Sequence, residues 1–74
     1  MPGVTVDNFE NVFTYHPPTA EDLVQYKAIR DGAKQLAAII IANTPVCADQ
    51  QAALRKLRET VMTANAAIAL LGAV

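Results

Sequence analysis

Apolar residues recur at steps of three and four along two segments of the chain, and each repeat predicts a helix. The first repeat predicts a helix over residues 20–42. Its periodic positions are Leu23, Tyr26, Ile29, Ala33, Leu36, Ile40 and Asn43. The second repeat predicts a helix over residues 47–71, with a spacing like that of a short heptad seam. Its periodic positions are Leu54, Leu57, Val61, Ala64, Ile68 and Leu71.

Residues at the ends of both repeats support these helix boundaries. Thr19 is a good N-cap, and Asp22 stands three residues later, where its carboxylate completes a short form of the capping box. Residues 43–45 end the first helix, because a residue that precedes proline is disfavoured in the helical conformation. Cys47 or a neighbour caps the second helix, and Gly72 is its expected stop. A connection this short makes the two helices an antiparallel hairpin.

The first 18 residues form an N-terminal arm without helical periodicity of useful length. Phe9 and Phe13 stand four residues apart, so a turn or two of helix presents both rings on one small face. We expect these rings to dock the arm onto the long helices. The fold class expected is therefore all-α: a single domain over residues 1–74, built as a two-helix hairpin with a short helical arm.

Hydrophobic residues make up 53% of the 74 residues, more than one helical hairpin can bury. Residues 36–42 and 64–71 are apolar nearly all round their helices. Two helices share one seam, so the remaining apolar surface predicts that the chain self-associates as a homo-oligomer. Asn65 interrupts the second apolar stretch, and we expect it to make a buried hydrogen bond that fixes helix register or holds the arm's backbone.

Charge and composition exclude several kinds of partner. The net charge of −1 argues against a DNA or RNA polymer, whose binding depends on many cation–phosphate contacts. The longest apolar runs are far shorter than the ~20 residues of a membrane span, so no membrane role is expected. The N-terminus has no signal-peptide pattern, and Cys47 is the only cysteine, which excludes an intrachain disulfide and fits a reducing cytoplasm.

The residues of known catalytic constellations are missing, so an enzyme is not expected. There is no serine, and His16 is the only histidine, which leaves Cys47 without a second histidine for a dyad. Glu21 and Asp22 fit acids at a helix start better than metal ligands. We therefore predict no catalytic residue, no metal site and no cofactor.

An aromatic ring beside a row of cations is the feature that points to a ligand. Tyr15 precedes two prolines in an extended lead-in, and three cations follow at helical spacing on one side of the first helix. Rings stack on bases and cations neutralise phosphates, so this pattern indicates a nucleotide pocket. The alternative is a half-buried tyrosine that staples the arm beside a solvated basic face. The candidate ligand-binding residues are Tyr15, His16, Pro17, Lys27, Arg30 and Lys34.

Four blocks of sequence resemble a known family. Residues 13–19, 25–34, 43–45 and 59–69 together are similar to the phage anti-CBASS cyclic-nucleotide sponges, namely the second anti-CBASS protein and its hairpin relatives. The resemblance runs from residue 13 to about residue 70. It implies a compact homohexamer that sequesters cyclic dinucleotides such as cGAMP without cleaving them, in the cytoplasm of the infected bacterium. A purely structural hairpin adaptor that acts through protein–protein contacts is the alternative.

The resemblance also implies roles for individual residues. Tyr15 is expected to stack on a base and Arg30 to contact the phosphates, with Lys27 and Lys34 as possible substitutes, in a pocket shared between protomers. Some relatives bind cyclic trinucleotides through a threonine and an arginine, and those two positions are Gly32 and Leu70 here. Neither residue supplies the contact, so mainly dinucleotide binding is expected.

Overall fold

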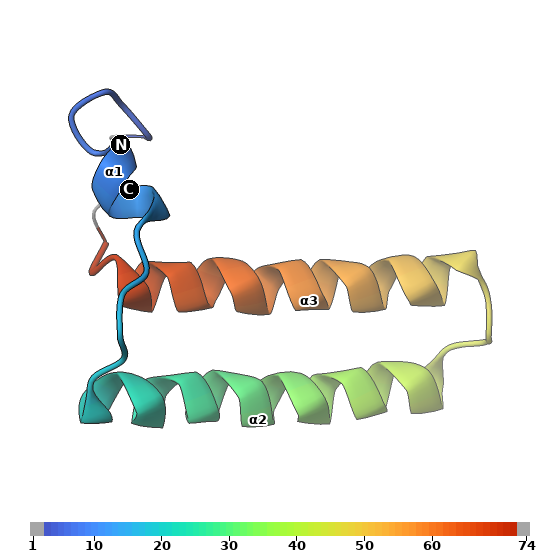
Figure 1. Ribbon diagram of the computed structural model, residues 1–74. Helices are drawn as coiled ribbons and strands as arrows, with labels where there is room; N and C mark the ends of the chain where they lie inside the picture. Colours follow the sequence, from blue (N-terminus) through green and yellow to red (C-terminus); the bar gives the residue numbers. More distant parts are fainter. Residues whose placement is uncertain (1–2, 73–74) are drawn as a thin grey trace.

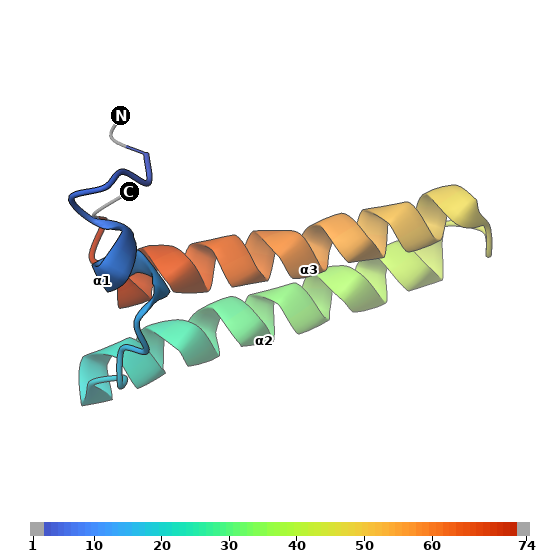
Figure 2. The same cartoon turned by 45° about the horizontal axis from the view of Figure 1, so that its top comes forward.

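Three helices make up the regular structure of the protein. A computed structural model describes residues 3–72, in which the helices are α1 (Phe9–Phe13), α2 (Ala20–Asn43) and α3 (Ala48–Ala69), with no strand among those residues. Helices α2 and α3 lie side by side and run antiparallel, while α1 lies at the open end of this hairpin, near the C-terminal end of α3 (Figure 1, and turned in Figure 2). The all-helical hairpin predicted from the sequence is confirmed.

Helix α2 begins with the expected capping box. The Asp22 backbone N–H donates to Thr19 Oγ1, and the Thr19 backbone N–H donates to Asp22 Oδ2, both at 3.1 Å. Two N–H groups that have no partner within the helix are satisfied in this way. The cap also sets the point at which the extended lead-in from the arm turns into the helix.

Replacing Thr19 with alanine is expected to destabilise the fold by about 1 kcal/mol, because one helix-start N–H loses its acceptor. For a domain of this size that loss lowers Tm by about 4–8 °C in thermal denaturation at fixed protein concentration. Thr63→Ala is the matched control, since Thr63 is exposed in the interior of α3 and caps no helix. An equal loss in both variants would show that the cap is not the cause.

The turn between the long helices is held by side chains. Thr44 Oγ1 donates to the Ile40 carbonyl oxygen at 2.6 Å, and Gln50 Nε2 donates to Thr44 Oγ1 at 3.1 Å across the turn. Gln50 is only 5% exposed, a burial that the sequence pattern did not indicate. Cys47 is the N-cap of α3, although its side chain makes no capping hydrogen bond. Helix α2 extends one residue past the expected end, to Asn43.

Helix α3 ends at Ala69, two residues before the end expected from its apolar repeat. The Leu71 N–H donates to the Ile68 carbonyl and the Gly72 N–H to the Ala67 carbonyl, which is the hydrogen-bond pair of a Schellman motif. Leu71 takes the left-handed conformation with φ 51°, and Gly72 follows with φ 74°. The helix stop therefore lies at Leu71 as well as at the predicted Gly72.

The residues of α2 that face α3 are only in part the periodic apolar positions predicted from the sequence. Leu23 and Leu36 are among those periodic positions, yet these residues are 56% and 46% exposed. Ala37 instead lines the space between the helices, together with Ala33 and Leu57. Helix α2 is apolar on several sides, so its own periodicity does not select the buried side, and small alanines allow the close approach.

The arm does not dock onto the hairpin through its rings, so that expectation was wrong. Phe13 is 81% exposed, and Phe9 is exposed as well. Among the described helices, α2 and α3 are the pair whose backbones pack together, and α1 packs on neither. Across residues 3–72 no apolar side chain is fully buried. Within that range, no helix combines the length and apolar character that crossing a membrane requires.

Candidate nucleotide-binding site

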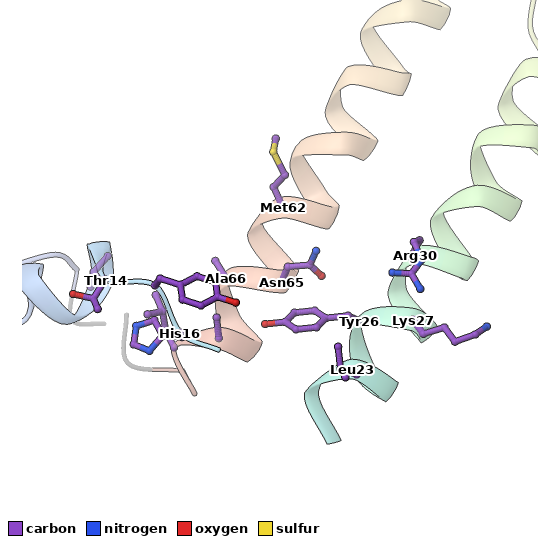
Figure 3. Close-up of a pocket in the computed structure, with 13 residues that line it drawn as sticks. Thr14, His16, Leu23, Tyr26, Lys27, Arg30, Met62, Asn65 and Ala66 are labelled. Carbon is purple, nitrogen blue, oxygen red and sulfur yellow. The ribbon is translucent and has the colours of Figure 1, made fainter. Parts of the chain in front are cut away.

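An open hollow lies where the lead-in, residues 14–19 between α1 and α2, meets the start of α2 and the end of α3 (Figure 3). Its volume is about 810 Å³, within the range of small-molecule sites. All three parts of the chain contribute side chains, so the hairpin and the lead-in together create it. The lining residues are Val12, Thr14, Tyr15, His16, Leu23, Tyr26, Lys27, Arg30, Met62, Asn65, Ala66, Ala69 and Leu70.

The lead-in presents Tyr15 at this hollow with its ring 79% exposed. The neighbouring residues are tied to the end of α1: Thr14 Oγ1 donates to the Glu10 carbonyl oxygen, and His16 Nε2 lies 2.6 Å from the Asn11 carbonyl oxygen. A carbonyl oxygen only accepts, so in this hydrogen bond His16 Nε2 is the donor. These bonds orient the segment, and the Tyr15 ring is left accessible to a ligand.

The three candidate cations do not share one location. Arg30 lines both the hollow and a separate groove between α2 and α3, whereas Lys34 lines only that groove. Lys27 is at the rim, and Figure 3 shows its side chain directed away from α3. Pro17 lines a smaller adjoining hollow of about 430 Å³, which it shares with His16. Of the candidate residues, Tyr15, His16, Lys27 and Arg30 therefore line one hollow, and Pro17 and Lys34 do not.

Lys27 is engaged in an ion pair on its own helix. Its Nζ lies 2.5 Å from Asp31 Oδ2, one helical turn further on. This hydrogen bond is the main reason why the pKa of Asp31 lies below its ordinary value, with smaller contributions from the charges of Lys27, Arg30 and Lys34. The pair is exposed, so salt screens it. Arg30 makes no ion pair among the described residues, and its guanidinium can take a phosphate.

Three polar residues of the hollow, Thr14, Tyr26 and Asn65, were not among the candidates. Figure 3 shows the Tyr26 ring directed from α2 toward α3, and the Asn65 side chain directed from α3 toward α2. Asn65 Oδ1 is buried and accepts no hydrogen bond within the described chain, so this oxygen does not hold the arm's backbone; the register role expected of Asn65 between copies stays a prediction. An unsatisfied buried acceptor costs about 1–3 kcal/mol. Tyr26, four residues before Arg30, could have been found from helical spacing.

The fold and the hollow define a small helical-hairpin protein with a candidate ligand site lined by aromatic rings, an amide and a guanidinium. Within residues 3–72, no group of three or more His, Cys, Asp or Glu side chains is placed to hold a metal ion. The family model described as "Acb2/Tad1, hairpin domain" matches residues 6–69.

The chain therefore belongs to the Acb2/Tad1 hairpin-domain family, which is the anti-CBASS sponge family that the sequence resembles. The matched residues include all three helices and the lead-in. The family is a nucleotide-binding sponge family rather than an enzyme family. A search of curated proteins and a search of solved structures each found no match.

Proposed function

We propose that this protein binds cyclic dinucleotide messengers of bacterial CBASS defence, such as cGAMP, and sequesters them. The observation that carries the proposal is that Tyr15 and Arg30 line one hollow inside the domain matched to the family. The ring offers a stacking surface for a base, and the guanidinium offers paired donors for a phosphate. A phage that carries such a sponge removes the messenger in the cytoplasm of the infected bacterium, so the defence effector stays inactive.

The chemistry of the hollow supports binding without cleavage. Its lining side chains include no carboxylate and no thiol, and His16 is its only imidazole. Activation of water or of a ribose hydroxyl needs a general base within reach, and the lining does not provide a pair of such groups.

The surface of the chain supports self-association. The chain exposes 5750 Å², whereas a compact monomer of 7.9 kDa exposes about 4400 Å². Its radius of gyration is 15.3 Å, compared with about 11 Å for a compact domain of this length. We propose a homo-oligomer that buries the outer apolar faces of the hairpin, with the family resemblance favouring a hexamer.

Thermal denaturation with and without cyclic dinucleotides tests the function. A ligand that binds only the folded state at a hundredfold excess over Kd adds about 2.7 kcal/mol of stability, so Tm should rise. Linear dinucleotides with the same bases are the control for nonspecific phosphate binding. If no cyclic dinucleotide raises Tm, the structural adaptor becomes the better interpretation.

Arg30→Ala is expected to weaken cyclic dinucleotide binding about tenfold, through loss of a charge-assisted hydrogen bond to phosphate. Lys27→Ala is the matched control on the same helix and should change Kd much less, because its ammonium is paired with Asp31 and directed away from the hollow. Isothermal titration at one salt concentration compares the two. A larger effect from Lys27 would assign the phosphate contact to that residue instead.

We also propose that cyclic trinucleotides are not ligands of this chain. A Cβ at Gly32 would meet no atom within 4 Å, so a threonine fits there without a clash. The double variant Gly32→Thr/Leu70→Arg should therefore gain trinucleotide affinity by about tenfold, through one added hydroxyl contact and one added charge. Isothermal titration measures both proteins. Sub-micromolar trinucleotide binding by the unmodified chain would contradict the proposal.

A further inference from the structure

A second concave surface runs along the hairpin beside the nucleotide hollow. This surface, the cationic groove, has a volume of about 580 Å³, an aliphatic floor from both long helices and three cations at its margin. The cations are Arg30, Lys34 and Arg58. Within residues 3–72 the only ion pair joins Lys27 to Asp31, so these three carry unpaired charge around an apolar floor. The floor residues are Ala33, Ala37, Ile41, Leu54, Leu57, Val61 and Met62.

The N-terminal arm of the same chain has the complementary chemistry. Between residues 3 and 15 it carries two acids, Asp7 and Glu10, and no basic residue. Its apolar side chains remain exposed, since α1 packs on neither long helix. The exposed apolar residues of the arm are Val4, Val6, Phe9 and Phe13. The arm therefore offers rings and negative charge, and the groove offers an apolar floor and positive charge.

Phe13 of one chain cannot reach the far end of the groove of that chain. Ile41, at the far end of the groove, lies about 32 Å along α2 from Ala20. The seven steps from Phe13 to Ala20 cover at most about 25 Å, and the hydrogen bond from His16 to the Asn11 carbonyl shortens that reach. Figures 1 and 2 place α1 at the open end of the hairpin, away from the turn between α2 and α3.

We infer that the arm of one copy, residues 4–13, docks into the cationic groove of a second copy. The contact covers exposed rings and an apolar floor together, and it places two carboxylates among three cations. Each chain carries both the arm and the cationic groove. Contacts of this kind therefore join copies of the chain without any other partner. The inference rests on the proposed self-association and adds which surfaces meet.

Disulfide trapping between two different single-cysteine variants of the chain tests this contact. In a Cys47→Ala background, one chain carries Phe13→Cys and the other carries Ala37→Cys or Ile41→Cys. Mixed under mild oxidation, the pair should form a heterodisulfide identified by mass spectrometry. The control partner carries Thr63→Cys, which lies outside the groove on another face of α3.

Reversing one groove charge, Arg58→Glu, should lower the initial cross-linking rate about fivefold, and Glu10→Lys in the arm chain should restore it.

The results of this experiment distinguish the arm–groove contact from self-association through other surfaces. Heterodisulfides at a groove position but not at Thr63→Cys, with rescue by Glu10→Lys, support the docking. An assembled protein without the groove cross-link, or with equal cross-linking at Thr63→Cys, overturns the arm contact and leaves self-association in place. An intramolecular disulfide in a chain that carries both cysteines also overturns it. A protein that sediments only as a monomer overturns both.

Discussion

Replacing Tyr15 with alanine is expected to weaken cyclic dinucleotide binding about 10- to 150-fold, because stacking of a base on an aromatic side chain contributes about 1–3 kcal/mol. The ring is 79% exposed in the free chain and packs into no core, so its removal leaves the fold unchanged. The exposed ring lines the same hollow as Arg30, which is where a base would lie if its phosphate reached the guanidinium. Isothermal titration with the preferred cyclic dinucleotide measures the loss.

Tyr15→Phe is the matched control, since it keeps the stacking face and removes only the hydroxyl. It should bind within about threefold of the unmodified protein, because no hydrogen bond of that hydroxyl supports the fold. Circular dichroism and sedimentation should be unchanged in both variants. Equal affinity of Tyr15→Ala and the unmodified protein would remove the ring from the ligand site and return it to a structural role.

The second large effect concerns assembly. The unmodified protein should sediment well above its 7.9 kDa chain mass, near 47 kDa for six copies. Ile39→Glu should drive it toward smaller species and lower its Tm strongly. Ile39 lies on an outer side of α2, 56% exposed in the single chain, and an unpaired carboxylate buried between copies costs several kcal/mol.

Ile39→Val keeps the position apolar and removes one methylene group, so it should retain the assembly. Sedimentation velocity at several protein concentrations distinguishes a weakened equilibrium from a misfolded chain, and circular dichroism reports helix content alongside. A monodisperse monomer for the unmodified protein in dilute solution would contradict the proposed self-association. The hollow formed by a single chain would then have to bind its ligand alone.

Assembly also bears on the stability of the single chain. No apolar side chain is fully buried within residues 3–72, so one hairpin gains little from the hydrophobic effect. The capping box at Thr19 and the Gln50–Thr44 hydrogen bond organise the ends of the helices, but each contributes only about 1 kcal/mol. Contacts between copies would supply the missing burial, and the exposed arm and cationic groove are two surfaces suited to it.

Local sequence patterns were sufficient to predict the two long helices and the cap at the start of α2. The repeats of three and four predicted α2 and α3, and Thr19 with Asp22 predicted the cap that the structure contains. The family was also recognisable from blocks of sequence and is confirmed by the match over residues 6–69. These features depend on residues that are close in the chain, or on motif order, so no three-dimensional information was needed.

The site was predictable only in part, because it depends on where side chains from different segments meet. Tyr15 and Arg30 were chosen from their chemistry, and the structure places both at one hollow. The ion pair of Lys27 with Asp31 and the position of Lys34 in another groove were not evident from the spacing of the cations. Spacing along a helix gives the side on which a residue lies, but not which neighbouring groups compete for its charge.

The sequence by itself determined that the chain is an all-helical hairpin of the sponge family with more apolar surface than one hairpin can bury. The tertiary structure decided which side of α2 faces α3, leaving Leu23 and Leu36 exposed and Ala37 between the helices. It also decided that Asn65 Oδ1 is buried without a partner and that α1 packs on neither long helix. The physical reason is that helix periodicity is a local property, whereas the rotation of one helix against another depends on packing across the whole seam.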